Sequence, residues 1–172
     1  MLAGDTPVHS LFLPVLENAP PALVVDCGAN LGYFSLLAAS RGHFVAAFEP
    51  LSVNLARFSA SVERNGWADR VALYHNALSF RHENVSVRAT DVRVNIGNGR
   101  VQKGALDRTS TSQSIYGVDY VETVRLDDVV PEIMRKGLPS ADGSGSNGAA
   151  SLGGFDRIKL IKIDVVRARA HH

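Results

Sequence analysis

Short apolar runs alternate with helical stripes along the first half of the chain. The runs at 22–28, 44–50 and 70–79 are continuous and rich in β-branched residues, which is typical of strands buried on both faces. Between them, 30–42 and 52–66 carry apolar residues at helical spacing and end at glycine. Strands and helices that alternate in this way predict parallel strands joined by right-handed crossovers. We therefore expect an α/β fold with a Rossmann-like, doubly wound and mainly parallel sheet.

The pattern changes after residue 80. Apolar and polar residues alternate over 85–103, which predicts an inserted β-hairpin with "GNG" at 97–99 as its tip. The segment 120–137 reads as a strand followed by a short helix, and 155–166 reads as a fourth strand of the parallel sheet.

The same pattern divides the chain into three parts. Residues 1–21 are expected to be an N-terminal extension, 22–166 a single α/β domain, and 167–172 a tail. Within the domain, 139–154 is rich in Gly, Ser and Ala and is expected to be a flexible loop.

Composition narrows the partners. The chain has 172 residues and a formal net charge of +1, so no strong field attracts nucleic acid or an anionic membrane. The basic stretch 81–108 lacks the interleaved aromatic residues that stack on bases. The single cysteine, Cys27, excludes an internal disulfide, and neither a signal peptide nor a membrane span is readable. Because no signal peptide or span is readable, the expected location is cytoplasmic. The histidines do not have metal-ligand spacing, so no metal site is expected.

The stretch "LVVDCGANLGYFS" at 23–35 carries the first chemical signal. Asp26, Gly28, Asn30 and Gly32 follow the first strand at alternate positions, and a helix begins directly afterwards. Glycine allows a sharp turn and a close approach by a ligand, while the start of the helix presents free N–H groups. Alone, this pattern also fits a tight strand–helix turn without a ligand.

An acidic residue strengthens the ligand interpretation. Glu49 ends the second strand, where a carboxylate can accept the hydroxyls of a ribose. A dinucleotide fingerprint has glycine where this chain has Asn30 and Tyr33, which counts against a nicotinamide-dependent oxidoreductase. Asp26 before the first glycine is also foreign to that fingerprint. The pattern instead resembles the cofactor turn of class I S-adenosylmethionine-dependent methyltransferases.

The resemblance narrows to one family. The segments "VVDCGANLGYFSLLAA", "FVAAFEPLSVNLARF", "VALYHNALS", "TVRLDDVV" and "IKLIKIDV" resemble, in this order, the FkbM family of methyltransferases. "GAN-x-G" and "FEP" are its more specific elements, and the match extends over about 22–166. The family implies S-adenosylmethionine as cofactor and O-methylation of a hydroxyl on a small molecule or glycan, such as a sugar or a secondary metabolite.

The resemblance also implies roles for individual residues. Glu49 would bind the ribose, Asn76 and Ala77 would flank the adenine, and Asp164 would lie at the methyl-transfer centre as a base or orienting group. Five residues of the turn would line the methionine end of the cofactor: Asp26, Gly28, Ala29, Asn30 and Gly32.

The end of the sequence departs from the family. The family pattern continues "KIDVEG-x-E", whereas this chain has Val166 in place of the glutamate and Arg167 in place of the glycine. The later strands of the family's sheet have no counterpart in this sequence. The expected fold is therefore incomplete in its C-terminal half, with an exposed sheet edge that promotes self-association. A truncated, non-catalytic remnant that binds the cofactor weakly or acts by association is the alternative to an active methyltransferase.

Overall fold

The computed structural model describes residues 8–17, 19–89, 99–103, 118–138 and 157–165. The expected loop at 139–154, the tail at 167–172 and residues 97–98 of the expected hairpin tip lie outside these residues.

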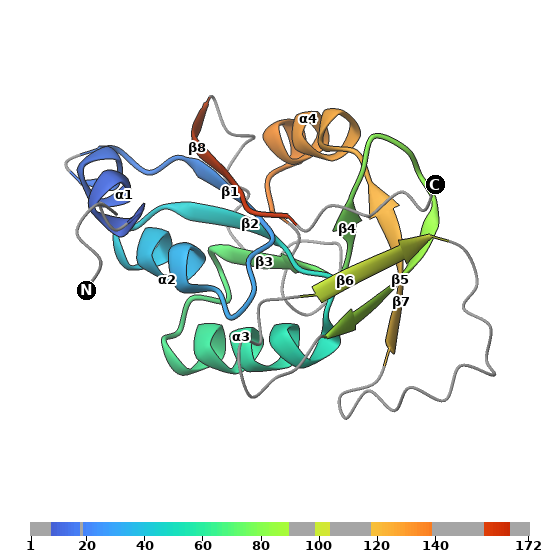
Figure 1. The fold of residues 1–172 in the computed structure, drawn as a ribbon. Coiled ribbons are helices and arrows are strands. Elements are labelled where there is room, and N and C mark those ends of the chain that lie inside the picture. Colours follow the sequence, from blue (N-terminus) through green and yellow to red (C-terminus); the bar gives the residue numbers. More distant parts are fainter. Residues whose placement is uncertain (1–7, 18, 90–98, 104–117, 139–156, 166–172) are drawn as a thin grey trace, which may run out of the picture.

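Four parallel strands form the first sheet, in the order β3-β2-β1-β8 (Figure 1). They are β1 (Leu23–Cys27), β2 (Phe44–Phe48), β3 (Val71–Tyr74) and β8 (Ile158–Ile163). All five residues of β1 are buried because strands flank it on both sides and helices cover both faces. This arrangement explains why β1 reads as a continuous apolar run, and it confirms the predicted α/β fold with a mainly parallel sheet.

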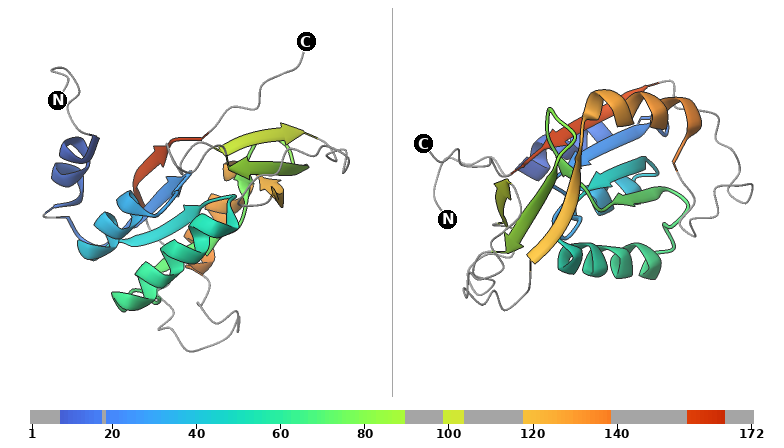
Figure 2. Two further views of the ribbon diagram at one scale, coloured as in Figure 1. Left: turned by 60° about the horizontal axis from the view of Figure 1, so that its bottom comes forward. Right: turned by 90° about the vertical axis from the view of Figure 1, so that its right-hand side faces the viewer.

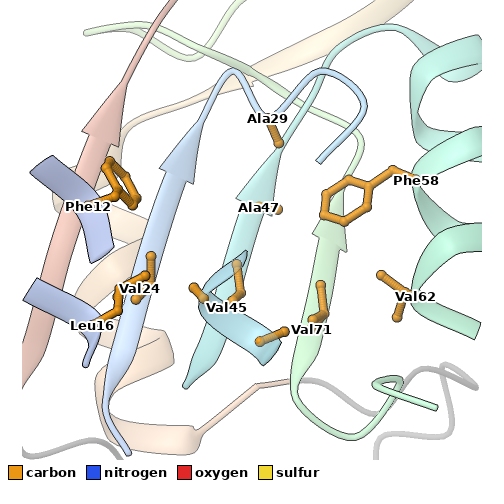
Figure 3. Packing of buried hydrophobic residues seen from close by; sticks show 11 residues of the cluster. Phe12, Leu16, Val24, Ala29, Val45, Ala47, Phe58, Val62 and Val71 are labelled. Carbon is orange, nitrogen blue, oxygen red and sulfur yellow. The ribbon is translucent and has the colours of Figure 1, made fainter. Parts of the chain in front are cut away.

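Helices cover the two faces of this sheet. On one face, α2 (Tyr33–Ser40) and α3 (Ser52–Arg64) follow β1 and β2 in the chain, as a right-handed crossover requires. Figure 3 shows Phe58 and Val62 of α3 directed at the sheet, with Val62 beside Val71 of β3. On the other face lies α4 (Leu126–Lys136) (Figure 2). Its Ile133 is buried in a second hydrophobic cluster, together with residues of β1 and β2. Helices on both faces make the sheet doubly wound.

An additional helix, α1 (Val8–Leu16), lies within the segment 1–21, which was predicted to be an N-terminal extension and for which no helix was predicted. Its Phe12 and Leu16 are buried beside β1, one helical turn apart (Figure 3). The ring centroids of Phe12 and Phe34 lie 4.5 Å apart. Pro14 lies inside α1, which continues past it to Leu16. The helix thus adds two large side chains to the core.

A second sheet lies beside the first, in the order β4-β7-β5-β6 (Figure 1). Its strands are β4 (Ala77–Leu78), β5 (Asn84–Ala89), β6 (Gly99–Lys103) and β7 (Val118–Val124). The antiparallel pairing of β5 with β6 confirms the predicted hairpin. The predicted tip at 97–99 was wrong, because Gly99 already belongs to β6 and pairs with Ala89. β5 also pairs antiparallel with β7.

One predicted strand was wrong. The run at 70–79 is two strands, because the chain leaves the first sheet after Tyr74 and resumes as β4, parallel to β7. At the crossing, the side-chain amide of Asn76 donates to the Glu122 carbonyl at 3.1 Å. Two short strands in different sheets thus share one apolar run.

Within the described residues, β8 has a strand partner on one side only, so it forms an edge of the first sheet. Its exposed apolar residues alternate along the strand and just beyond it: Ile161, Ile163 and Val165, with exposed fractions of 44%, 64% and 43%. In the described part of the chain, no helix is long and apolar enough to cross a membrane.

Candidate functional site

The turn after β1 is held in a left-handed backbone conformation at alternate residues. Gly28, Asn30 and Gly32 have φ values of +78°, +55° and +85°. A side chain at Gly28 would place its Cβ 2.1 Å from the Asp164 carbonyl oxygen, and one at Gly32 would lie 2.3 Å from the Phe58 ring. Asparagine tolerates this conformation better than most residues, so the G-A-N-L-G sequence is matched to the turn.

Glu49 connects this turn to the next strand–helix unit. Its Oε2 accepts a hydrogen bond from the Asn30 N–H at 2.9 Å. Its Oε1 accepts from the Leu51 N–H at 3.1 Å and from the Asn54 side-chain amide at 3.1 Å. A carboxylate offers about four acceptor positions, so these three donors leave one on Oε2. The sequence predicted that Glu49 would bind both hydroxyls of a ribose, whereas this geometry has capacity for one.

Burial changes the acidity of Glu49. The residue is 4% exposed, and burial raises the pKa of its carboxyl above the ordinary value of 4.5. The hydrogen bonds from Asn30, Leu51 and Asn54 act in the opposite direction because they stabilise the charged form. The charged form needed to accept a ligand hydroxyl is therefore lost at a higher pH than for an exposed glutamate.

Asp26 lies beneath the turn as a buried carboxylate, 1% exposed. Its Oδ2 accepts a hydrogen bond from the Ser35 hydroxyl at 2.7 Å. Lys162 of β8 places its Nζ 3.1 Å from Asp26 Oδ1 and donates to the Gly28 carbonyl at 2.7 Å. A buried carboxylate requires such partners, because an unpaired charge in the interior is strongly destabilising.

Asp164 follows the end of β8 next to the turn. Its N–H donates to the Cys27 carbonyl at 2.9 Å, and its carbonyl lies against Gly28. The residue is exposed, and its carboxylate has no partner among the described residues. The predicted transfer-centre residue and the predicted turn are thus adjacent in space, although 136 residues separate Asp164 from Gly28.

Unpaired polar groups also lie at the turn. The first hydrogen bond of α2 is donated by the Leu36 N–H to the Gly32 carbonyl, so the N–H groups before it have no acceptor within the helix. The side-chain oxygen of Asn30 is buried and has no hydrogen-bond partner within the described residues. Leu31 and Tyr33 beside them are exposed, at 40% and 58%. Polar donors, an unpaired acceptor and apolar side chains therefore meet at one point.

Asn76 and Ala77 lie at the crossing between the two sheets. The backbone brings this region near Glu49, whose N–H donates to the Tyr74 carbonyl at 3.1 Å. Ala77 is 7% exposed and packs in a cluster with Leu51, and the Asn76 amide is bonded to β7. Both residues thus follow the end of β3, but neither side chain bonds to the turn.

Three polar residues at the site were not predicted from the sequence: Ser35, Asn54 and Lys162. Each had a detectable signal, namely a polar side chain at a position facing the core. Asn54 shares the buried face of α3 with Phe58 and Val62 at four-residue spacing. Lys162 is two residues from Leu160, which packs against the core, and therefore lies on the same face of β8. A buried polar residue needs a partner, and here the partners are the predicted acids.

Cys27 is a buried free cysteine at the end of β1. Burial, followed by the neighbouring Asp26 carboxylate, raises the pKa of the Cys27 thiol to about 11, although the Lys162 ammonium lowers it. The thiol is therefore not a nucleophile near neutral pH. In the described ranges, no group of three His, Cys, Asp or Glu residues could hold a metal ion.

Comparison with known proteins gives partial likenesses only. No family model and no curated protein matches the chain. The C-terminal domain of precorrin-6Y C5,15-methyltransferase from Rhodobacter capsulatus matches 43% of this chain and 40% of its own, at 19% identity and a TM-score of 0.39. A SAM-dependent methyltransferase from Geobacter sulfurreducens in complex with S-adenosyl-L-homocysteine matches 42% of this chain and 31% of its own, at 23% identity and a TM-score of 0.37.

A SAM-dependent methyltransferase from Agrobacterium tumefaciens matches 40% of this chain and 22% of its own, at 17% identity and a TM-score of 0.36. In all three cases the chain spans less than half the length of the structure it resembles. Likenesses at these TM-scores do not decide fold or function, which rest on the geometry of the chain itself.

Proposed function

We propose that the chain binds S-adenosylmethionine at the turn after β1 and is an S-adenosylmethionine-dependent methyltransferase of the FkbM type. The observation that carries the proposal is the hydrogen bond from the Asn30 N–H to Glu49 Oε2 at 2.9 Å. It joins the glycine turn to the acid at the end of the next strand, which is the pair of features that an adenosine cofactor requires in a doubly wound sheet. The sequence motifs supply the choice of S-adenosylmethionine over a dinucleotide.

The residues of the turn fit such a ligand. The buried, unpaired side-chain oxygen of Asn30 and the free N–H groups at the start of α2 are a donor and acceptor set for the amino acid end of the cofactor. In this proposal five residues line that end: Asp26, Gly28, Ala29, Asn30 and Gly32. Glu49 accepts one ribose hydroxyl through Oε2, and Asn76 and Ala77 flank the adenine.

The bound cofactor supplies an activated methyl group, so the protein contributes mainly position and proton transfer. We assign the proton-accepting or orienting role to Asp164, whose exposed carboxylate has no partner within the described residues. The proposed reaction is O-methylation of a hydroxyl on a small molecule or glycan. Asp164→Asn should then lower kcat for S-adenosylhomocysteine release with a panel of hydroxyl acceptors, without changing cofactor affinity. Unchanged kcat would contradict the role of Asp164.

Calorimetric titration with S-adenosylhomocysteine tests cofactor binding. We expect one site per chain and little or no heat with NAD. Tight NAD binding would instead favour the oxidoreductase interpretation, and no binding of either compound by the folded chain would refute the proposal.

A role in association rests on a separate observation, the exposed apolar residues of the β8 edge. Ile163 has an exposed fraction of 64% on an edge strand, and such edges pair with other chains. If the chain acts by association, sedimentation should show a dimer that Ile163→Lys dissociates. A monomer at all concentrations would exclude this role.

A further inference from the structure

The ammonium of Lys162 is buried between β8 and the turn after β1. Its side chain is 11% exposed, with Nζ 3.1 Å from Asp26 Oδ1, 2.7 Å from the Gly28 carbonyl oxygen and 5.6 Å from the centre of the Phe34 ring. Lys162 therefore holds the residue that precedes the turn and the first carbonyl within it. Asp26 and Lys162 are also register partners in the paired strands.

The end of β8 contacts the turn at two further points, both through the backbone. The Asp164 N–H donates to the Cys27 carbonyl at 2.9 Å. The Asp164 carbonyl oxygen lies so close to Gly28 that a Cβ added there would be only 2.1 Å from this oxygen. The last two residues of β1, Asp26 and Cys27, and the first residue of the turn, Gly28, are thus all in contact with β8 or with Asp164 directly after it. Since β8 is an edge strand within the described residues, a single neighbouring strand holds it in the sheet.

Asp26 makes Lys162 more than a packing residue. Its carboxylate is 1% exposed and bonded to Ser35, which positions the first turn of α2. Without the cation, a buried negative charge would have no counter-charge within the described residues, and the carboxylate would have to rearrange. Any such rearrangement moves both ends of the turn, because Asp26 precedes it and Ser35 follows it.

We propose that Lys162 is a positioning residue that keeps the turn in its cofactor-binding shape and makes that shape depend on the docking of β8. The effect on cofactor binding rests on the proposed function, whereas the effect on the shape of the turn rests on the ligand-free structure alone. Lys162 itself need not contact the cofactor.

Hydrogen exchange in the ligand-free chain tests the effect on the turn. The N–H groups of Gly28 and Ala29 both donate to the Phe48 carbonyl and that of Asn30 to Glu49, so all three should exchange slowly. Lys162→Met should speed their exchange at least about tenfold, while exchange in β2 stays unchanged. Equal acceleration in the turn and in β2 would show a general loss of stability and overturn the proposal.

Affinity for S-adenosylhomocysteine tests the consequence. Lys162→Met should weaken binding at least about tenfold, which corresponds to about 1.4 kcal/mol. Lys162→Arg should restore most of the affinity because it keeps the cation. Lys159→Met, in the same strand, should bind as the unmodified chain does. The proposal would be overturned if Lys162→Met had the same exchange rates in the turn and the same affinity as the unmodified chain. It would also be overturned if Lys159→Met lost as much affinity as Lys162→Met.

A double variant covers the case in which Lys162→Met does not fold. Asp26→Asn with Lys162→Met removes the buried charge together with its partner, and it should fold while its turn still exchanges fast, because the bond to the Gly28 carbonyl is gone. Slow exchange in the folded double variant would overturn the proposal. If the unmodified chain does not bind S-adenosylhomocysteine, the proposed function fails, whereas the exchange measurements still decide the role of Lys162.

Discussion

Gly28→Ala should destabilise the chain far more than the same change at another left-handed glycine. Gly28 has φ +78°, and a Cβ added there would lie 2.1 Å from the Asp164 carbonyl oxygen. Gly42 has φ +82°, but nothing lies within 4 Å of its Cβ position. The two substitutions share the backbone strain and differ in the close approach of β8.

The expected difference follows from these contacts. Alanine in the left-handed conformation costs about 1–2 kcal/mol at either position. At Gly28 the Asp164 carbonyl must in addition retreat by roughly an ångström, and overpacking of this kind costs about 1–3 kcal/mol. The retreat also breaks the Asp164-to-Cys27 hydrogen bond, which contributes about 0.5–1.5 kcal/mol. Gly28→Ala should therefore lose about 1.5–4.5 kcal/mol more than Gly42→Ala.

Urea denaturation followed by circular dichroism measures both losses, provided that the slope of the transition is the same in all variants. Gly66→Ala is a second control, because Gly66 has φ +69° and also has open space at its Cβ position. If Gly28→Ala and Gly42→Ala lower the free energy of unfolding equally, the chain that follows β8 does not pack closely against the turn. The dependence of the turn on β8 would then be refuted as well.

Three further predictions concern buried groups at the site. Glu49→Gln should weaken S-adenosylhomocysteine binding about 10- to 150-fold, the value of a hydrogen bond to a charged group. Since burial raises the pKa of Glu49, binding to the unmodified chain should decline with falling pH well before pH reaches 4.5. Ser35→Ala should lower the free energy of unfolding by about 1.5–3 kcal/mol, because Asp26 loses a hydrogen bond to a charged oxygen. Cys27, with a pKa of about 11, should react with iodoacetamide near neutral pH only after denaturation.

Matched variants distinguish these effects from general damage. Glu63→Gln, on the exposed side of α3, should bind the ligand as the unmodified chain does, and Ser61→Ala should change stability by less than about 0.5 kcal/mol. If binding persists undiminished down to pH 4.5, Glu49 is not the acceptor. A stability loss at Ser35 no larger than that at Ser61 would contradict the bond to Asp26. Rapid labelling of Cys27 in the folded chain would contradict its burial.

The parts of the fold predicted from sequence are those that local patterns determine. Three buried parallel strands and two covering helices follow from continuous apolar runs and helical stripes, and the G-A-N-L-G turn follows from its glycines. The break at Tyr74 could not be predicted, because one apolar run serves two strands and only pairing with β7 separates them. Helix α1 was not predicted, although Phe12 and Leu16 carry the helical spacing.

Some residues of the candidate site could likewise be identified from the sequence, and others could not. Asp26 and Glu49 could be identified because each ends, or nearly ends, an apolar run, whereas Asp164 was identified through the resemblance to the FkbM family. Their partners could not be assigned, because Lys162 meets Asp26 across 136 residues and Asn54 reaches Glu49 from a helix. Local patterns also did not predict that Glu49 is buried. Its carboxylate accepts three hydrogen bonds within the protein, which leaves capacity for one more.

The most direct test of the account is a ¹H–¹⁵N spectrum of the chain titrated with S-adenosylhomocysteine. The account predicts that the amide signals of Gly28, Asn30 and Gly32 shift together with those next to Glu49, and that the signals of the α4 helix do not move. Absence of any shift, or shifts confined to residues away from the turn after β1, would contradict it.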